Sequence, residues 1–137
     1  MESTKKGRSC RVRTLIVDDS APVAHLITAL LEGHGLCEVV GMAGKGQEAI
    51  EIVAALRPDL VIMDVQMPKM NGIDATRIIK RRPNAPHVVI ITFDHRKAYE
   101  DAAYGAGADG FCSKEDIAEQ LPPLLRKLFP PSSKNKA

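Results

Sequence analysis

The stretch LVIMDVQMPKMNG, from Leu60 to Gly72, decides how the rest of the chain is interpreted. Leu60 to Met63 are apolar without interruption, which is typical of a strand covered on both faces. This run ends on a carboxylate, Asp64, and the turn-forming pairs Met67-Pro68 and Asn71-Gly72 follow it. A charge at the mouth of a buried strand is unusual, because unpaired charges are costly to bury. Partners for Asp64 are therefore expected elsewhere in the chain.

Short runs of this kind alternate with helical patterns along the chain, which indicates an α/β domain built on a parallel sheet. The middle runs are apolar throughout, as strands with helices on both faces should be. The sequence therefore predicts an α/β fold with a doubly wound, five-stranded parallel sheet. The five strand candidates are Val12–Val17, Glu38–Met42, Leu60–Met63, Val88–Thr92 and Gly110–Cys112.

Apolar residues at helical spacing predict helices after these strands. The fourth helix, from His95 to Ala106, offers mainly alanine methyl groups for burial, so it should be the loosest. Pro122-Pro123 interrupts the fifth, because proline cannot donate a backbone hydrogen bond, and we expect that helix to be short and to start near the prolines. The first helix carries Val23, Leu26, Ile27, Leu30 and Leu31, the second carries Ala49, Ile52, Val53 and Leu56, and the third runs from about Gly72 to Lys80.

Composition is typical of a protein with one domain in a reducing compartment. With 137 residues and 45% hydrophobic content, the chain can bury one core but not two. A formal charge of +2 is too small for a general nucleic-acid binder, and no apolar run approaches a membrane span. Three cysteines without a CxxC spacing argue against a disulfide framework, so we expect a cytoplasmic protein. The predicted domain covers residues 11–129, between a flexible basic tail at 1–10 and a flexible tail at 130–137.

Polar side chains gather at the predicted carboxyl ends of the strands. Asp18-Asp19 follow the first strand, Asp64 ends the third, Thr92 ends the fourth, and Lys114 comes soon after the fifth. In doubly wound parallel sheets, ligands bind outside these ends, near the point where the strand order reverses. If the first and third strands are neighbours, three carboxylates share one pocket with a hydroxyl and an ammonium on its rim. Such carboxylates repel one another and suit Mg²⁺, which prefers hard oxygen ligands.

A pocket of this composition can accept a phosphoryl group. A carboxylate beside a metal can attack phosphorus and form an acyl phosphate, while Lys114 offsets charge on the phosphoryl oxygens and Thr92 donates its hydroxyl. Taken singly, each residue has an ordinary explanation: Asp18 and Asp19 as turn or helix-cap residues, Lys114 as a surface charge. Their joint placement at the ends of successive strands favours the pocket.

Four motifs, LIVDDS, LVIMDVQMPKMNG, VVIITF and GADGFCSK, resemble in order and spacing those of response-regulator receiver domains of two-component signalling. The resemblance covers roughly Arg11 to Leu128. It implies a flavodoxin-like sheet with strand order 2-1-3-4-5 and a single-domain switch similar to chemotaxis regulators. Such a switch takes its phosphoryl group from a histidine kinase or phosphotransfer protein. It is not an enzyme beyond its own phosphorylation and dephosphorylation.

The resemblance implies a chemical role for each residue of the pocket. Asp64 is the phosphoacceptor, and Lys114 pairs with the phosphoryl group. Mg²⁺ is held by Asp18, Asp19 and Asp64 together with the backbone carbonyl of Gln66.

The resemblance also implies how the signal leaves the pocket. Thr92 is the switch hydroxyl, and Phe111 is the aromatic side chain whose rotation is coupled to it. A downstream protein would dock on the face formed by the fourth helix, the fifth strand and the fifth helix, and a homodimer is compatible with this picture. Direct DNA binding is not expected, because no residues remain for a helix-turn-helix.

Three alternatives stay open at this level. Gly44–Ala49 matches a GxGxxA dinucleotide-binding pattern, but it follows the second predicted strand rather than the first. A Mg²⁺-dependent phosphatase with an aspartate nucleophile tends to carry a second acid two positions further on, a spacing that Asp18-Asp19-Ser20 lacks. A phosphorylation-independent pseudo-receiver would serve only as an adaptor.

Two positions depart from the receiver pattern. A small residue commonly follows the switch threonine, whereas Phe93 follows Thr92, and a proline often follows the lysine, whereas Glu115 follows Lys114. We expect the ring of Phe93 to narrow access to the pocket and to slow entry or hydrolysis of the phosphoryl group.

Overall fold

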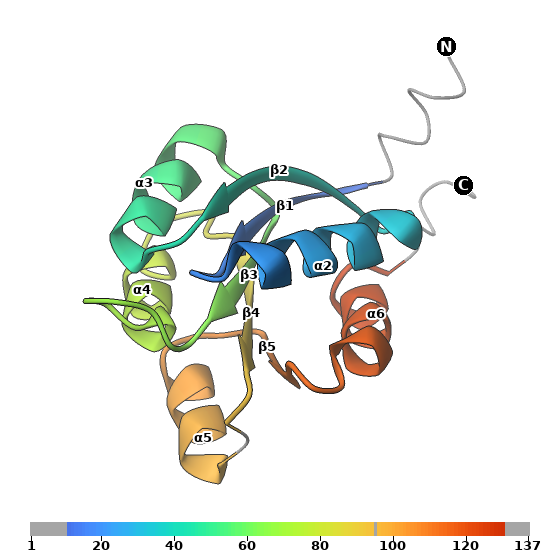
Figure 1. Ribbon diagram of the computed structural model, residues 1–137. Helices are drawn as coiled ribbons and strands as arrows, with labels where there is room; N and C mark the ends of the chain where they lie inside the picture. Colours follow the sequence, from blue (N-terminus) through green and yellow to red (C-terminus); the bar gives the residue numbers. More distant parts are fainter. Residues whose placement is uncertain (1–10, 95, 131–137) are drawn as a thin grey trace.

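The computed structural model describes residues 11–94 and 96–130 (Figure 1). Most of the two predicted tails, residues 1–10 and 131–137, lies outside the described residues, as does His95, the first residue of the predicted fourth helix. In chain order the elements are β1 (Val12–Val17), α2 (Ala21–Gly33), β2 (Cys37–Ala43), α3 (Gly46–Leu56), β3 (Leu60–Asp64), α4 (Gly72–Ile79), β4 (His87–Thr92), α5 (Lys97–Gly105), β5 (Gly110–Ser113) and α6 (Ile117–Leu128).

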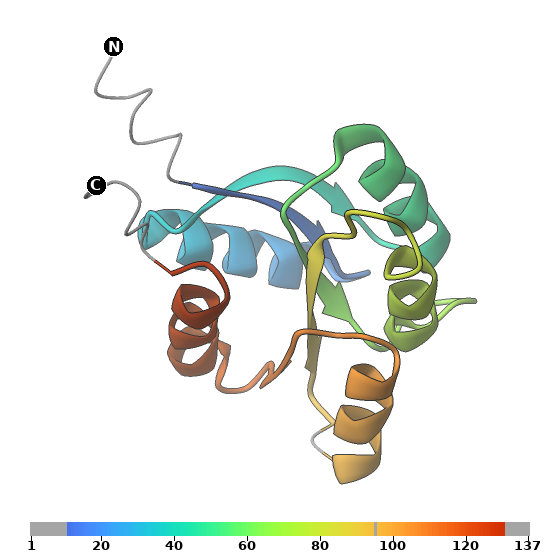
Figure 2. The same ribbon diagram turned by 180° about the vertical axis from the view of Figure 1, so that it is seen from behind.

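The five strands form one parallel sheet in the order β2-β1-β3-β4-β5, which confirms the predicted doubly wound α/β fold. Helices α2 and α6 cover one face of the sheet, and α3, α4 and α5 cover the other (Figures 1 and 2). Each face has its own apolar core, because inward side chains alternate between the two faces along every strand. β3 is the central strand, and all five of its residues are buried.

The predicted strands are confirmed. β1 has the predicted bounds, and each of the others differs from its prediction by one residue at one or both ends. The third predicted helix is also confirmed, as α4. Apolar runs identify the middle strands β3 and β4, because a strand covered on both faces buries alternate side chains on opposite sides.

The predicted apolar stripe of the first helix is partly wrong. The side chains of α2 that are buried are Ala24, Ile27 and Leu31, whereas Leu26 is 64% exposed. Ala24, with its single methyl group, faces the sheet closely, and the leucine one position before Ile27 points to solvent. Leu56 of α3 is likewise 39% exposed although the pattern predicted it to be buried. Hydrophobic spacing indicates that a helix is amphipathic, but it orients the buried face only approximately.

The expectation of a short fifth helix that begins near the prolines is wrong. α6 has 12 residues and begins at Ile117, so Pro122 and Pro123 lie inside it. Ile117, Leu121 and Leu125 follow one another at a spacing of four, and their buried side chains anchor the helix on the core. Pro122 and Pro123 have no N–H to donate to the carbonyls of Ala118 and Glu119. Both of these residues are exposed, so water can donate hydrogen bonds to the two carbonyls instead. Burial of the apolar face therefore outweighs the proline penalty.

This arrangement predicts that Pro123→Ala stabilises the protein. Pro123 is exposed, and alanine would supply an N–H for the carbonyl of Glu119 without changing the core. We expect the free energy of unfolding, measured by urea denaturation, to rise by about 1 kcal/mol. Pro22→Ala is the matched control, because Pro22 lies in the first turn of α2, where no helical N–H is needed, and it should bring no gain. An unchanged or lower stability in Pro123→Ala would contradict this account.

α5 is the helix with the least buried surface of its own. Ala103 is buried within it, and Ala106 is buried just beyond its end, while Ala98 and Ala102 are exposed. Its greater mobility stays a prediction. No helix in the described part of the chain combines the length and apolarity that crossing a membrane requires.

Candidate functional site

Three carboxylates meet at the carboxyl edge of the sheet because β1 and β3 are neighbours in register. Val17 is paired with Met63, so Asp18 and Asp64, the next residues of the two strands, end at the same level. Ligand oxygens of Asp18, Asp19 and Asp64 lie within 4.8 Å of one another. Asp18 and Asp64 are buried, whereas Asp19 is exposed. The structure thus brings together the three acids that the sequence singled out.

Lys114 joins this cluster from the end of β5. Its Nζ lies 2.7 Å from Oδ2 of Asp18 and 3.1 Å from Oδ1 of Asp64. The Lys114 side chain is only 8% exposed, so this is a buried ion pair with two acids rather than a surface contact. One ammonium facing three carboxylates leaves the cluster with a net negative charge.

Burial and the net negative charge of the cluster shift the pKa of Asp64. Burial, and after it the neighbouring charge of Asp18, raise the pKa of Asp64 from 3.8 to about 6, against the opposing effects of Lys114 and the backbone N–H of Gln66. Oδ2 of Asp18 is buried and has no hydrogen-bond partner in the described residues, although Lys114 lies close to it. Carboxylate oxygens are hard ligands, and this cluster has more negative than positive charge, so it suits a divalent cation such as Mg²⁺.

The loop after β1 leaves its acids available for this site. Ser20 caps α2, because its hydroxyl accepts a hydrogen bond from the N–H of Val23 at 3.3 Å. Of the alternative explanation of Asp18 and Asp19 as turn or helix-cap residues, the helix-cap part is therefore wrong, whereas the hydrogen bond from the N–H of Ser20 to Asp18 is one that a turn residue makes. Asp18 does accept a hydrogen bond from the N–H of Ser20 at 2.8 Å, which orients its carboxylate with the other oxygen toward Lys114.

The other residues assigned by resemblance lie around the cluster. Thr92 is buried at the end of β4, and its hydroxyl accepts a hydrogen bond from the N–H of Asp94 at 3.0 Å. Phe111 is half-buried and packs against the core beneath α3, α4 and α5. The N–H of Gln66 faces Oδ1 of Asp64 at 3.4 Å. The metal-binding role of the Gln66 carbonyl and the coupling of Thr92 to Phe111 stay predictions.

Gly72 is a site residue whose role the sequence pattern did not reveal. Asn71 caps α4 by accepting a hydrogen bond from the N–H of Asp74, which is the helix start that an Asn-Gly pair suggests. The structure adds that Gly72 lies directly on the backbone of Asp64. A Cβ at Gly72 would be 1.9 Å from the carbonyl oxygen of Asp64, and the N–H of Gly72 donates to the carbonyl of Val65 at 2.8 Å. This contact fixes the loop that follows the central strand.

Phe93 lies against the site, as the departure from the pattern suggested. Its side chain is 57% exposed, and its ring centroid is 5.3 Å from Nζ of Lys114. The ring therefore covers the outer side of the ammonium that pairs with Asp18 and Asp64. A cation held over an aromatic face in this way gains about 0.5–1 kcal/mol.

If Asp64 carries a phosphoryl group, this contact predicts that Phe93→Ala speeds its loss. Without the ring, water reaches the pocket and Lys114 more easily, and we expect dephosphorylation to be roughly threefold to fivefold faster than in wild type, followed by the decay of phosphoprotein after donor removal. Phe93→Leu keeps the bulk without the aromatic face and should fall between the two. A rate in Phe93→Ala equal to or below that of wild type would refute the prediction.

The comparisons with known proteins agree with this geometry. The sequence matches the response regulator receiver domain family over residues 14–126. It is 38% identical over 132 residues to a protein-glutamate methylesterase/protein-glutamine glutaminase of a Nocardioides species, covering 87% of this chain and 36% of that protein. It is 41% identical over 113 residues to the transcriptional regulatory protein PdtaR of Mycobacterium tuberculosis, covering 82% of this chain and 54% of that protein. The chain thus spans about a third to a half of the length of these relatives.

Solved structures share the whole described fold. The response regulator domain of Thermotoga maritima CheB superposes with a TM-score of 0.77 at 28% identity, over 85% of this chain and 94% of that one. A LuxR-family two-component response regulator from an Aurantimonas species gives a TM-score of 0.81 at 30% identity, over 87% and 85% of the two chains. The chain therefore belongs to the response regulator receiver domain family of two-component signalling.

Proposed function

We propose that this chain is a phosphorylation switch in which Asp64 accepts a phosphoryl group from a histidine kinase or phosphotransfer protein. The observation that carries the proposal is the convergence of Asp18, Asp19 and Lys114 on the carboxylate of Asp64, at the carboxyl edge of a doubly wound sheet. The nucleophile ends the central strand at the carboxyl edge of the sheet.

Asp18, Asp19 and Asp64 would hold Mg²⁺, with the backbone carbonyl of Gln66 as a further ligand. Support comes from the net negative charge of the cluster, in which three carboxylates face one ammonium. When bound, the ion offsets negative charge on the phosphoryl oxygens.

Asp64 supplies the attacking oxygen. With a pKa of about 6, its carboxylate is largely ionised at pH 7 and able to attack. The new bond forms between this oxygen and phosphorus while the bond between phosphorus and the donor nitrogen breaks, and the departing imidazole takes up a proton. Lys114, now between Asp18 and Asp64, pairs with a phosphoryl oxygen and so exchanges one anionic partner for another.

Thr92 and Phe111 would carry the signal onward. The Thr92 hydroxyl, which accepts from the N–H of Asp94, can turn and donate its own proton to a phosphoryl oxygen, and this pulls the β4–α5 loop toward the pocket. We assign the docking of a downstream protein to the face of α5, β5 and α6, where Tyr104 is 47% exposed. A cytoplasmic location, the absence of direct DNA binding and a homodimer at some stage of signalling belong to the same proposal.

The experiment that tests the proposal is intact mass spectrometry after incubation with acetyl phosphate and Mg²⁺. The wild-type chain should gain one phosphoryl group, and Asp64→Ala should gain none. Asp101→Ala is the matched control, because Asp101 is a 65% exposed acid on α5, and it should gain the group as wild type does. The proposal fails if the wild type stays unmodified or if Asp64→Ala is modified to the same extent.

The same assay separates the switch from the remaining alternatives. A phosphatase would release phosphate from the donor over many turnovers, whereas a receiver holds its group in stoichiometric amount and loses it slowly. A pseudo-receiver would gain no phosphoryl group at all.

A further inference from the structure

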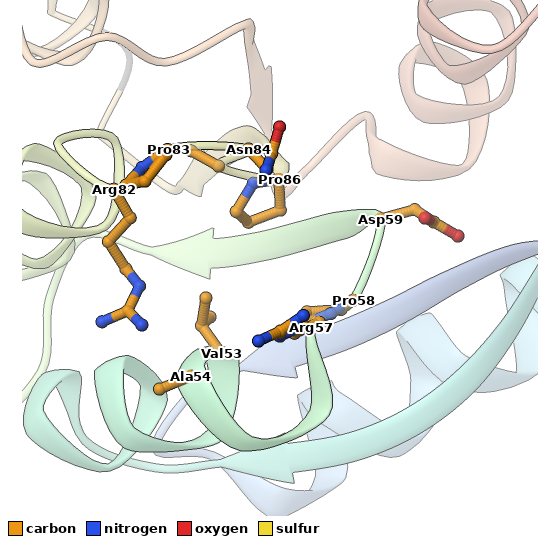
Figure 3. A pocket seen from close by; sticks show the side chains of 10 residues that line it. Val53, Ala54, Arg57, Pro58, Asp59, Arg82, Pro83, Asn84 and Pro86 are labelled. Atoms are coloured by element: carbon orange, nitrogen blue, oxygen red, sulfur yellow. The ribbon is translucent and has the colours of Figure 1, made fainter.

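A cavity lies at the edge of the sheet where β3 and β4 begin, opposite to the edge that carries Asp64. It has a volume of about 370 Å³ and opens between α3 and the loop that joins α4 to β4 (Figure 3). Its base is formed by Val53, and proline rings from two loops, Pro58, Pro83 and Pro86, stand around it. Because β3 and β4 begin here, the cavity is a full strand length from the carboxylate cluster.

Two arginines line this cavity, and no acid in the described part of the chain forms an ion pair with either. Arg82 reaches down from the α4–β4 loop, and Arg57 lies on the other side of Val53, so the two guanidinium groups flank the base of the cavity (Figure 3). Neither side chain pairs with a carboxylate within residues 11–94 and 96–130. The nearest acid in the lining, Asp59, points away from both (Figure 3).

Arg13, a third arginine, donates hydrogen bonds to Asp59 and to the backbone of Arg57. The carboxylate of Asp59 accepts a hydrogen bond from the N–H of Arg13 at 3.0 Å, and Nη1 of Arg13 donates to the carbonyl of Arg57 at 2.8 Å. Arg57 itself has a left-handed backbone with φ of 49° at the end of α3. The main chain of Arg57 is thereby tied down, while its guanidinium remains available to a ligand.

From this arrangement we infer that the cavity binds a small organic phosphate of about nucleotide size. Guanidinium groups recognise phosphate through paired N–H donors, and two of them on one cavity supply the charge for a phosphate ester. The valine base and the proline rings give the apolar contact that an organic group needs, and a volume of about 370 Å³ lies at the lower end of the range for small-molecule pockets. Inorganic phosphate alone would leave most of the cavity empty.

The inference is tested by NMR titration of the full chain with adenosine 5′-monophosphate as the probe, in EDTA so that no metal draws the nucleotide to Asp64. The backbone amides of residues 53–59 and 82–86, except Pro58, Pro83 and Pro86, should shift in a saturable way. Inorganic phosphate and adenosine, each given alone, should bind at least about tenfold more weakly, because each makes only part of the contacts.

The decisive variants remove the two guanidinium groups without emptying the core. Arg57→Gln and Arg82→Gln should each weaken binding about tenfold, and the double variant should lose it. Arg81→Gln is the matched control, because Arg81 is an exposed neighbour that does not line the cavity, and it should bind as wild type does.

Three results would overturn the inference: no saturable shift, shifts that centre on Asp18 and Asp64, or equal loss of affinity in Arg81→Gln. Affinity for inorganic phosphate as high as for the nucleotide would also overturn it. These results leave the proposed role of Asp64 untouched, because the variants should still gain a phosphoryl group from acetyl phosphate.

Discussion

Gly72→Ala should lower the free energy of unfolding by about 3 kcal/mol, at the upper end of what overpacking costs. The added Cβ would lie 1.9 Å from the carbonyl oxygen of Asp64 and 2.8 Å from Cγ of Met63, and neither neighbour can give way easily. Asp64 belongs to the central strand, so relief has to come from movement of α4 and of the loop before it. Such movement would break the hydrogen bond between the N–H of Gly72 and the carbonyl of Val65.

Urea denaturation measures the stability loss, and calorimetric titration with Mg²⁺ reports on the pocket. We expect weaker Mg²⁺ binding in Gly72→Ala as well, because the loop that moves includes Gln66 and begins at Asp64. Gly33→Ala is the matched control: Gly33 ends α2, and a Cβ there meets nothing within 4 Å. Alanine at that position should be neutral or stabilise by up to about 1 kcal/mol. Equal effects of the two substitutions would contradict the close contact at Gly72.

Asp64→Asn should stabilise the metal-free protein at neutral pH. Folding raises the pKa of Asp64 from 3.8 to about 6, so the folded state holds the proton more tightly than the unfolded state does. The charged carboxylate therefore costs no stability below pH 4, costs progressively more as the pH rises toward 6, and reaches a constant cost above that value. Asparagine removes this cost while keeping the shape of the side chain.

The gain should be about 2 kcal/mol at pH 7.5, since each pKa unit corresponds to about 1.4 kcal/mol and water at the pocket mouth screens part of the shift. At pH 4.5 the gain should fall below about 1 kcal/mol. The measurement is urea denaturation in EDTA at both pH values, with Asp101→Asn as the exposed control. Saturating Mg²⁺ should reverse the order, because it binds the wild type more tightly than the variant. A gain that is the same at both pH values would show that charge is not its cause.

Much of the fold follows from local patterns in the sequence. Apolar runs such as Leu60 to Met63 predict strands because a doubly covered sheet imposes the same requirement on every one of them. The strand ends then predict that Asp18, Asp19, Asp64 and Lys114 lie close together, and the structure shows this proximity. The positions of these residues can be predicted from the sequence, because the carboxyl ends of all strands in a parallel sheet lie at the same edge.

Other features depend on contacts between distant segments, so the local sequence does not predict them. Pro122 and Pro123 predict a break, but the burial of Leu121 and Leu125 maintains the helix across them. The approach of Gly72 to Asp64 depends on the path of the intervening loop, and Asn71-Gly72 alone indicates only a turn or helix start. Leu26 shows the same limit, because apolar spacing does not tell which residue of a stripe the sheet will cover.

Because few side chains of α5 are buried, displacing this helix should cost little free energy. The buried side chains of this segment are those of Ala103 and Ala106, and the partly buried ring of Tyr99 packs beside them, so its displacement exposes a modest apolar area. A single new hydrogen bond to a charged oxygen contributes about 1.5–3 kcal/mol, which is enough to shift a balance of that size by tenfold or more. Under the proposed function, phosphorylation of Asp64 at the centre of the sheet would rearrange the surface beside β5 while both cores stay closed.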